Sequence, residues 1–395
     1  MKKAWKAAAA CAAALCASVC TAVGVAGRMT CDSYHVTPGM TLSWNQGMIS
    51  ARPAEALAAS GGASTRYQAE LMLFDAIPVK TISVSVVPEL QVIPGGTPFG
   101  IKMFTDGVMV VGLSEIQTKD GMRNPGEEAG LRMGDVLVSV GGVEVNRNEE
   151  VAALMEQSGG KPVELRYVRE NKEASATLTP VKSLVDGRFK AGLWVRDSTA
   201  GIGTVTYYDP ATMQFGGLGH GVCDTDTSEL MPFLSGEILP VTISGVTKGA
   251  PGAPGELHGY FAGDEAIGVM DANDAAGVYG SLYAQPAGES VPVALRQEVS
   301  PGEAQIISTV DGEGPQTYRV ILEYVNYLDS GEGKNLIVRV TDPVLLEKTG
   351  GIVQGMSGSP ILQNGKLVGA VTHVFVNDPT RGYGIFAENM LEAAG

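Results

Sequence analysis

The second half of the chain alternates short apolar segments with turn residues, and this pattern constrains its fold more than any other feature. Segments rich in β-branched and aromatic residues, bounded by Gly, Pro or Asp, occur at residues 202–208, 305–310, 317–324 and 335–340. Such spacing, without helical periodicity, is typical of barrels and sandwiches. We therefore expect an all-β domain at residues 183–395, compatible with a trypsin-like double barrel. Residues 291–295 contain Pro292, which limits that segment to a sheet edge.

Length and charge narrow the classes of protein. A chain of 395 residues is too long for one ordinary core, so we expect two or three domains. The net charge of −15 would repel phosphate backbones, which argues against a nucleic-acid partner. The four histidines are isolated from one another and none lies in a Cys/His cluster with zinc spacing, so no metal or other cofactor is predicted.

The N-terminus has the layout of an export signal. Lys2, Lys3 and Lys6 precede an uncharged apolar run at residues 7–27, which is long enough to be either a cleaved signal or a retained membrane anchor. Residues 1–27 are therefore predicted to form a signal or anchor helix. Residues 28–75 contain an Ala/Gly/Ser-rich stretch and are predicted to form a flexible stalk.

Two cysteines lie outside the apolar run, Cys31 and Cys223. One disulfide between them is compatible with export, but two cysteines cannot form a disulfide framework. Their redox state is left open by the sequence.

A second domain is predicted at residues 76–182, with a strand at 77–87 in front of it. Residues 124–140 contain a short helical turn, a Gly-Leu step and a Gly-Asp turn before an apolar strand, and they resemble the core of a bacterial PDZ domain. An amphipathic helix at 149–157 and a strand at 163–169 complete this α+β pattern. In the PDZ fold a peptide adds as a strand beside that helix, so a peptide ligand is expected. Residues 95–101 are expected to shape part of the groove.

The chemistry-bearing motif is Gly-x-Ser-Gly-x-Pro at residues 355–360. Glycine at 355 and 358 lets the backbone turn sharply, so that the amides of Gly355 and Ser357 can converge on one oxygen as an oxyanion hole. This predicts Ser357 as a nucleophile. The motif by itself also fits an ordinary β-turn, and Ser359, next to Pro360, is a competing nucleophile.

A serine nucleophile needs a base within hydrogen-bond reach, and His220 in a Gly-rich turn upstream is the best candidate. His258 fits a solvated loop better. His373 is either a half-buried strand residue or part of a substrate pocket. Spacing does not select the third member among five acids: Asp224, Asp226, Asp271, Asp311 and Asp342.

Several segments together resemble the stage IV sporulation protein B peptidases: residues 87–89, 92–96, 197–204, 217–220, 351–361 and 371–380. The resemblance spans residues 71–395. It implies that His220 is the general base, Ser357 the nucleophile and Asp342 the residue that orients the histidine. Asp342 lies only 15 residues before Ser357 (357 − 342), so analogy with trypsin-like enzymes would not have selected it.

The resemblance also implies a regulatory serine endopeptidase of endospore formers. Such peptidases are exported across the forespore membrane into the intermembrane space. They cleave a membrane-bound regulator of sigma-factor processing and also process themselves, and their PDZ domain recognises self and substrate. Residues 50–64 are hypothesised to contain a self-cleavage site. The alternatives are an inactive PDZ scaffold that docks signalling partners and a structural envelope protein.

Overall fold

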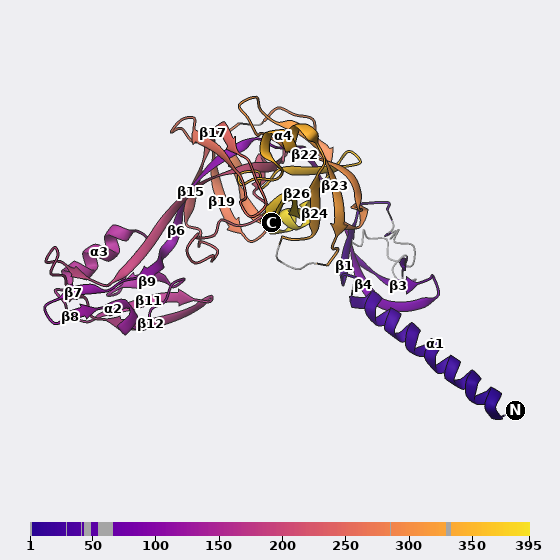
Figure 1. Ribbon diagram of the computed structural model, residues 1–395, viewed down its shortest axis with the longest axis horizontal. Helices are drawn as coiled ribbons and strands as arrows, with labels where there is room; N and C mark the ends of the chain where they lie inside the picture. The colour runs from indigo at the N-terminus through magenta and orange to yellow at the C-terminus, as the bar shows by residue number, and fades with distance from the viewer. Residues whose placement is uncertain are drawn as a thin grey trace.

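The computed structural model describes residues 2–28, 30–40, 42, 49–53, 66–284, 286–328 and 333–395, and for residues 2–12 and 15 it describes the backbone alone. Figure 1 shows three parts in a row. A helix and a small sheet lie at one end, the strand-rich body lies in the middle, and an α+β unit lies at the far end of two long strands. The predicted multidomain fold, a PDZ domain followed by a β-rich domain, is confirmed.

The N-terminal part is a helix followed by a four-stranded sheet. The elements are α1 (Lys2–Arg28), β1 (Ser33–Val36), β2 (Ile49–Pro53), β3 (Arg66–Leu73) and β4 (Ile77–Val86), and the strand order is β1-β4-β3-β2. Within the described parts of the chain, no helix combines the length and the apolar character needed to cross a membrane.

This sheet stands where the sequence predicts a flexible stalk. Tyr34, Leu71 and Val84 are buried in its core, because alternate residues of the strands point to one face. β1 and β3 sandwich β4 and satisfy its backbone groups from both sides. The most Ala/Gly/Ser-rich residues, 54–64, lie outside the described residues, and with them most of the hypothesised self-cleavage region.

The α+β unit agrees with the sequence-based expectation. It contains α2 (Pro125–Glu128), β9 (Val136–Val140), β10 (Val143–Glu144), α3 (Asn148–Gln157), β11 (Val163–Arg169) and β12 (Lys172–Leu178). Two short ladders flank these elements, β7 (Ile116–Thr118) with β8 (Gly121–Arg123) and β13 (Val181–Lys182) with β14 (Phe189–Lys190).

Local chemistry explains the PDZ signature. The Asn124 side chain caps α2 by accepting from the Glu127 N–H, and Gly130 follows α2 with a φ of 79° that favours glycine. The buried Asp135 carboxylate accepts from the Arg132 N–H at 2.8 Å and pairs with the Arg169 guanidinium at 2.6 Å. These bonds tie the turn before β9 to the end of β11.

The central body contains two rings of strands. The first runs β6 (Pro98–Leu113), β17 (Ser235–Thr247), β19 (Gly268–Asp274), β20 (Gly277–Leu282), β16 (Gln214–Gly217) and β15 (Leu193–Tyr208), and pairing of β15 with β6 closes it. β18 (Glu256–Phe261) extends from β17. β5 (Gln91–Pro94) and β21 (Val291–Pro292) end the sheet, so the Pro292 segment is at an edge as predicted.

The second ring is a closed barrel of β22 (Gly302–Ser308), β23 (Gln316–Val325), β24 (Leu336–Val340), β27 (Asp378–Phe386), β26 (Lys366–Phe375) and β25 (Pro360–Gln363). The 3-10 helix η1 (Arg296–Glu298) precedes it, α4 (Pro343–Thr349) follows β24, and α5 (Ala387–Ala394) ends the chain. Ile306, Leu322, Val338 and Val371 are among its fully buried core residues.

β6 and β15 belong to both the first ring and the PDZ unit. Residues 98–104 of β6 pair with β17 in the ring, whereas Val108 and Met109 pair with β9 in the PDZ sheet. The expected role of residues 95–101 in the PDZ groove is therefore wrong. Gly95 and Gly96 donate to carbonyls of Thr206 and Val205 in the ring. The domain limits 76–182 and 183–395 remain a prediction about folding units, because paired strands cross them.

The two cysteines outside α1 are both free thiols. Cys31 Sγ donates to the Tyr327 carbonyl at 2.7 Å, whereas Cys223 lies beside the Gly221 carbonyl at 3.8 Å. The two side chains thus contact different parts of the body, and no disulfide joins them.

Candidate active site

Ser357 lies in a tight turn between α4 and β25. Gly355 and Gly358 have φ values of 94° and 96°, in the region that favours glycine. A Cβ at Gly358 would lie 1.9 Å from the Thr204 carbonyl oxygen and 2.5 Å from the Leu218 nitrogen. Position 358 therefore admits no side chain, and its glycine allows the serine turn to pack directly on the turn that precedes His220.

Strand β15 holds this turn from behind. The Thr204 N–H donates to the Ser357 carbonyl at 3.0 Å, and Thr204 Oγ1 donates to the Gly355 carbonyl at 2.8 Å. Thr206 Oγ1 donates to the Gly358 carbonyl at 2.8 Å. Sequence reasoning did not single out these two threonines. Their only signal was a pair of hydroxyls at i and i+2 on one face of a strand.

The amides predicted for an oxyanion hole are available. Among the described residues, neither the Gly355 N–H nor the Ser357 N–H has a hydrogen-bond acceptor, although the intervening Met356 N–H donates to the Val353 carbonyl. Because the three carbonyls of the turn are bound by β15, the turn is held in one conformation. Two unpaired N–H groups on a fixed turn are what a developing oxyanion requires.

The competing nucleophile is excluded by burial. Ser359 is fully buried, and its hydroxyl donates to Ser308 Oγ at 3.0 Å inside the barrel. Ser357 is partly exposed, and its hydroxyl donates to the Thr372 carbonyl of β26 at 2.6 Å. No histidine nitrogen is bonded to Ser357 within the described residues, and catalytic contacts of this kind often close only when substrate binds.

His220 and His373 lie together beside this turn. His220 follows β16 after Gly219, whose Cβ position lies 3.0 Å from the Thr372 side chain on β26. The rings of His220 and His373 are 4.7 Å apart between centroids and tilted by 35°. The structure therefore brings His220, His373 and Ser357 together at the junction of the two strand rings, although they are far apart in the chain.

Lost hydration lowers the pKa of both histidines, although His373 is still exposed at the surface and only His220 is partly buried. Loss of hydration lowers the pKa of His220, and its one hydrogen bond, from Nδ1 to the Gly221 carbonyl at 2.9 Å, offsets this only in part. Lost hydration and repulsion from His220 and Lys334 lower the pKa of His373 to about 4. Both rings are therefore neutral at pH 7. Because Nδ1 is bonded to a carbonyl it carries the proton, so Nε2 of His220 is the basic nitrogen.

The five candidate acids are bound elsewhere. Asp342 is the N-cap of α4, where Oδ1 accepts from the Val344 N–H at 2.9 Å and Oδ2 accepts from the Arg319 N–H at 3.3 Å. Within the described residues it makes no hydrogen bond to His220. The others are bound as well: Asp224 and Asp226 to Arg196, Asp271 to Ser281, and Asp311 to Lys348. His258, the remaining histidine near this body, bonds to Thr247.

A second candidate site lies in the PDZ unit. A pocket of about 310 Å³ lies between α3 and the segment that enters β15. Val151 and Met155 of α3 line one wall, and Phe189 and Leu193 line the other. This is the position beside the helix at which a peptide is predicted, but the facing strand comes from residues that follow the PDZ signature.

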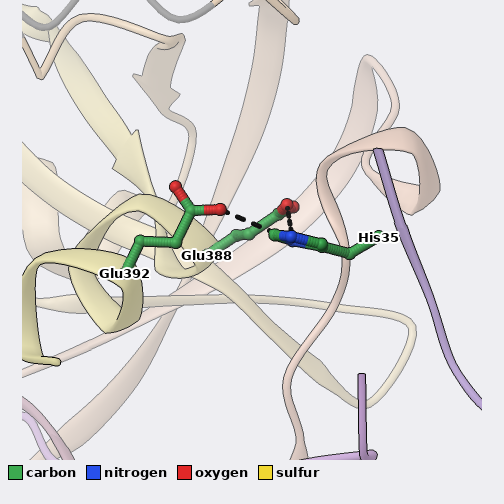
Figure 2. A group of neighbouring side chains, drawn as sticks. All are labelled: His35, Glu388 and Glu392. Atoms are coloured by element: carbon green, nitrogen blue, oxygen red, sulfur yellow. Dashed lines mark hydrogen bonds and ion pairs between the residues drawn. The ribbon is translucent and has the colours of Figure 1, made fainter. Parts of the chain in front are cut away.

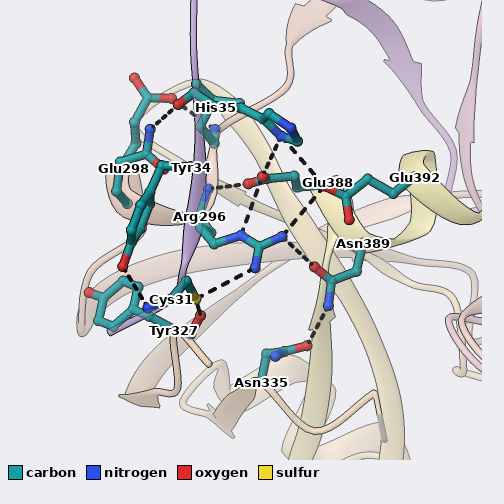
Figure 3. A network of polar contacts seen from close by, with 12 residues as sticks. Cys31, Tyr34, His35, Arg296, Glu298, Tyr327, Asn335, Glu388, Asn389 and Glu392 are labelled. Carbon is teal, nitrogen blue, oxygen red and sulfur yellow. Dashed lines mark hydrogen bonds and ion pairs between the residues drawn. The ribbon is translucent and has the colours of Figure 1, made fainter. Parts of the chain in front are cut away.

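One group of side chains has the donor types of a metal site. His35, Glu388 and Glu392 offer three atoms within 4.8 Å of one another (Figure 2). The guanidinium of Arg296 already contacts both carboxylates, with Nε 3.3 Å from Glu388 and Nη2 3.6 Å from Glu392 (Figure 3). Because the Arg296 guanidinium already supplies a positive charge here, we interpret the group as an ion-pair network and not as a metal site. The network joins β1 to α5, which are more than 350 residues apart in the sequence.

The chain was compared with curated proteins and with solved structures. No curated protein has a significant sequence match to the chain. The protease Rv3671c of M. tuberculosis, in an inactive form, is 12% identical with a TM-score of 0.28, and the match covers 49% of this chain and 84% of that one. A serine-to-alanine mutant of the same protease has a TM-score of 0.29, 12% identity and coverages of 49% and 82%. Scores this low carry no argument about this chain.

The matches to two family models, in contrast, are informative about this chain. Residues 123–169 match a PDZ domain, and residues 187–391 match the family described as SpoIVB peptidase S55. The second match spans more than half of the chain and contains β15, His220 and Ser357. The chain therefore belongs to the SpoIVB peptidase S55 family and is a serine peptidase with a PDZ domain.

Proposed function

We propose that Ser357 and His220 are the catalytic nucleophile and general base of an exported endopeptidase that cleaves itself and a membrane-bound regulator during endospore formation. The observation that supports this pair best is the packing of the serine turn on the histidine turn at Gly358. This packing joins a nucleophile from the second ring to a base from the first.

In the proposed reaction, His220 Nε2 removes the proton of Ser357 Oγ while that oxygen attacks the scissile carbonyl carbon. The carbonyl oxygen becomes negative and accepts from the Gly355 and Ser357 amides. The C–N bond then breaks, and the imidazolium of His220 donates its proton to the leaving amine. Water, deprotonated by the same nitrogen, hydrolyses the acyl-enzyme and restores the Ser357 hydroxyl.

The role that family resemblance assigns to Asp342, orientation of His220, is retained as a hypothesis. In the free enzyme the Gly221 carbonyl accepts from His220 Nδ1, so this carbonyl supports the same tautomer that an aspartate would. His373, whose ring lies 4.7 Å from that of His220, is proposed to border the substrate.

The biological part of the proposal comes from the N-terminal layout and the family. Lys2, Lys3 and Lys6 before an apolar run support export across the forespore membrane, with the helix either kept as an anchor or removed. The pocket beside α3 supports docking of a peptide, either from a substrate or from a second copy of the chain.

Covalent labelling by a fluorophosphonate tests the catalytic pair. We expect labelling of the wild-type protein and its loss in both Ser357→Ala and His220→Ala, with Ser359→Ala as the matched control for the nearby buried hydroxyl. Circular dichroism checks that each variant is folded. Absence of label on folded wild-type protein would favour the alternative, an inactive PDZ scaffold.

A further inference from the structure

A pocket of about 380 Å³ borders the serine turn at Gln354 and Gly355. Its other walls are Ala200 and Ile202 of β15, and Glu256 and Phe261 of β18. None of its lining residues comes from β26, the strand that accepts the Ser357 hydroxyl. A substrate chain that crosses the serine turn would therefore have this pocket on one side of the scissile bond and β26 on the other.

The pocket is fixed to the catalytic turn by main-chain hydrogen bonds. The Gln354 N–H donates to the Gly255 carbonyl at 2.8 Å, and the Leu257 N–H donates to the Gln354 carbonyl at 2.9 Å. Glu256 lies between these two bonds, directly opposite Gln354. Its position relative to the Gly355 amide is thus set by the backbone, as a specificity residue requires.

The chemistry of the walls selects a cation. Glu256 is exposed, and among the described residues its carboxylate forms no hydrogen bond or ion pair, although its backbone pairs with Thr247 in the sheet. None of the described residues that line the pocket is a lysine or arginine, and Phe261 presents an aromatic side chain that is 39% exposed. An aliphatic stem can pack on Ile202 and the ring while its charged end reaches the carboxylate.

Resting on the proposed peptidase function, we propose that this pocket is a substrate subsite for a lysine or arginine side chain next to the scissile bond, with Glu256 as the residue that determines specificity. The bound cation would be partly shielded from water by Phe261 and by the substrate. Its attraction to Glu256 is then stronger than at an open surface.

Selectivity among peptides tests this subsite. Internally quenched peptides that vary one position at a time between Lys, Leu and Glu should show, at one position beside the cut, a preference for Lys over Leu of about tenfold in kcat/KM. Glu256→Gln should abolish that preference, and Glu256→Lys should reverse it toward Glu. Glu289→Gln, an exposed carboxylate outside the pocket, is the matched control and should keep the wild-type ratio. Unchanged ratios in both Glu256 variants would overturn the inference while leaving the peptidase intact.

A binding measurement keeps the subsite testable even without turnover. The fluorescent aromatic amidine p-aminobenzamidine, titrated into Ser357→Ala, should bind about tenfold more weakly once Glu256→Gln is added. Gly201→Val should also weaken binding, because Gly201 lines the pocket and a valine side chain there would fill part of it. A Cβ at Gly201 meets no other atom and the backbone there suits any residue, so this variant should fold normally. Equal affinity in all three backgrounds would contradict the subsite. Absence of fluorophosphonate labelling, in contrast, would count against the catalytic pair.

Discussion

His35 and His220 are both partly buried, yet their environments shift their pKa values in opposite directions. Nδ1 of His35 lies 2.9 Å from the Glu388 carboxylate, and this contact raises the pKa of His35. His220 lacks a carboxylate partner among the described residues, and burial lowers its pKa. The His35–Glu388 pair therefore stabilises the junction of β1 and α5, whereas the histidine beside Ser357 is kept neutral and can accept a proton.

Removal of each imidazole is the strongest test of this contrast. We expect His220→Ala to lower kcat/KM by roughly 10³-fold or more, as loss of a general base does. His35→Ala should keep the wild-type rate and lose stability instead. Peptide hydrolysis and urea unfolding measured on both variants check this, and a comparable loss of activity in His35→Ala would abolish the distinction.

The junction of β1 and α5 should depend on its most buried carboxylate. Glu388 and Arg296 are only 6% and 7% exposed, and Glu388 Oε2 also accepts from the Arg296 N–H at 2.7 Å. Glu388→Gln removes the buried charge partner of the Arg296 guanidinium and leaves it only the more exposed Glu392 at 3.6 Å, so we expect a loss of about 3 kcal/mol in unfolding free energy. Glu392→Gln is the control: Glu392 is 45% exposed, and we expect a loss of less than about 1 kcal/mol. Denaturant titration measures both; equal effects would show that burial is not the cause.

Substitution of Asp342 tests whether this residue orients His220 or only caps α4. Because Asp342 caps a helix, its change to Ala should cost about 1 kcal/mol of stability and its change to Asn, which caps equally well, should cost less, with a change in kcat/KM of less than about tenfold in both variants. A loss nearer 10⁴-fold in Asp342→Asn would instead assign it the orienting role that family resemblance implies. Thermal unfolding and peptide hydrolysis of the same preparations separate the two outcomes.

The smallest expected effect is the pH dependence, which should have opposite signs at the two histidines. Because the pKa of folded His220 is lowered, its active neutral form persists below the usual pKa of about 6.5, and the acid limb of kcat/KM should lie below that value. The raised pKa of His35 means that its pairing with Glu388 and Glu392, near Arg296, stabilises the fold fully below about pH 6.5. That contribution to stability is lost as the pH rises through the raised pKa of folded His35. The predicted contribution of His35 would be contradicted if the unfolding free energies of wild type and His35→Ala changed in parallel with pH across this range.

Sequence and structure agree most closely where short-range chemistry decides the fold. The Asn124 cap, Gly130 and the Gly134-Asp135 turn specify the PDZ core locally, and strand β11 begins and ends where its alternation predicts. Three of the barrel strands, β22, β23 and β24, were likewise visible as apolar segments between turns. The serine turn was visible because Gly355 and Gly358 adopt positive φ values, which favour glycine.

The sequence alone thus determined the Ser357 turn, the PDZ pattern and the β-rich second half, because each depends on neighbouring residues and on backbone conformations that only certain residue types adopt. Tertiary structure decided how these parts combine. Strand pairing made β6 and β15 common to the ring and the PDZ unit, and it placed Thr204 behind the serine turn across 151 residues of sequence. It also formed a sheet in a segment whose composition predicts a stalk. Contacts between residues far apart in the chain leave no local pattern, so only the folded molecule reveals them.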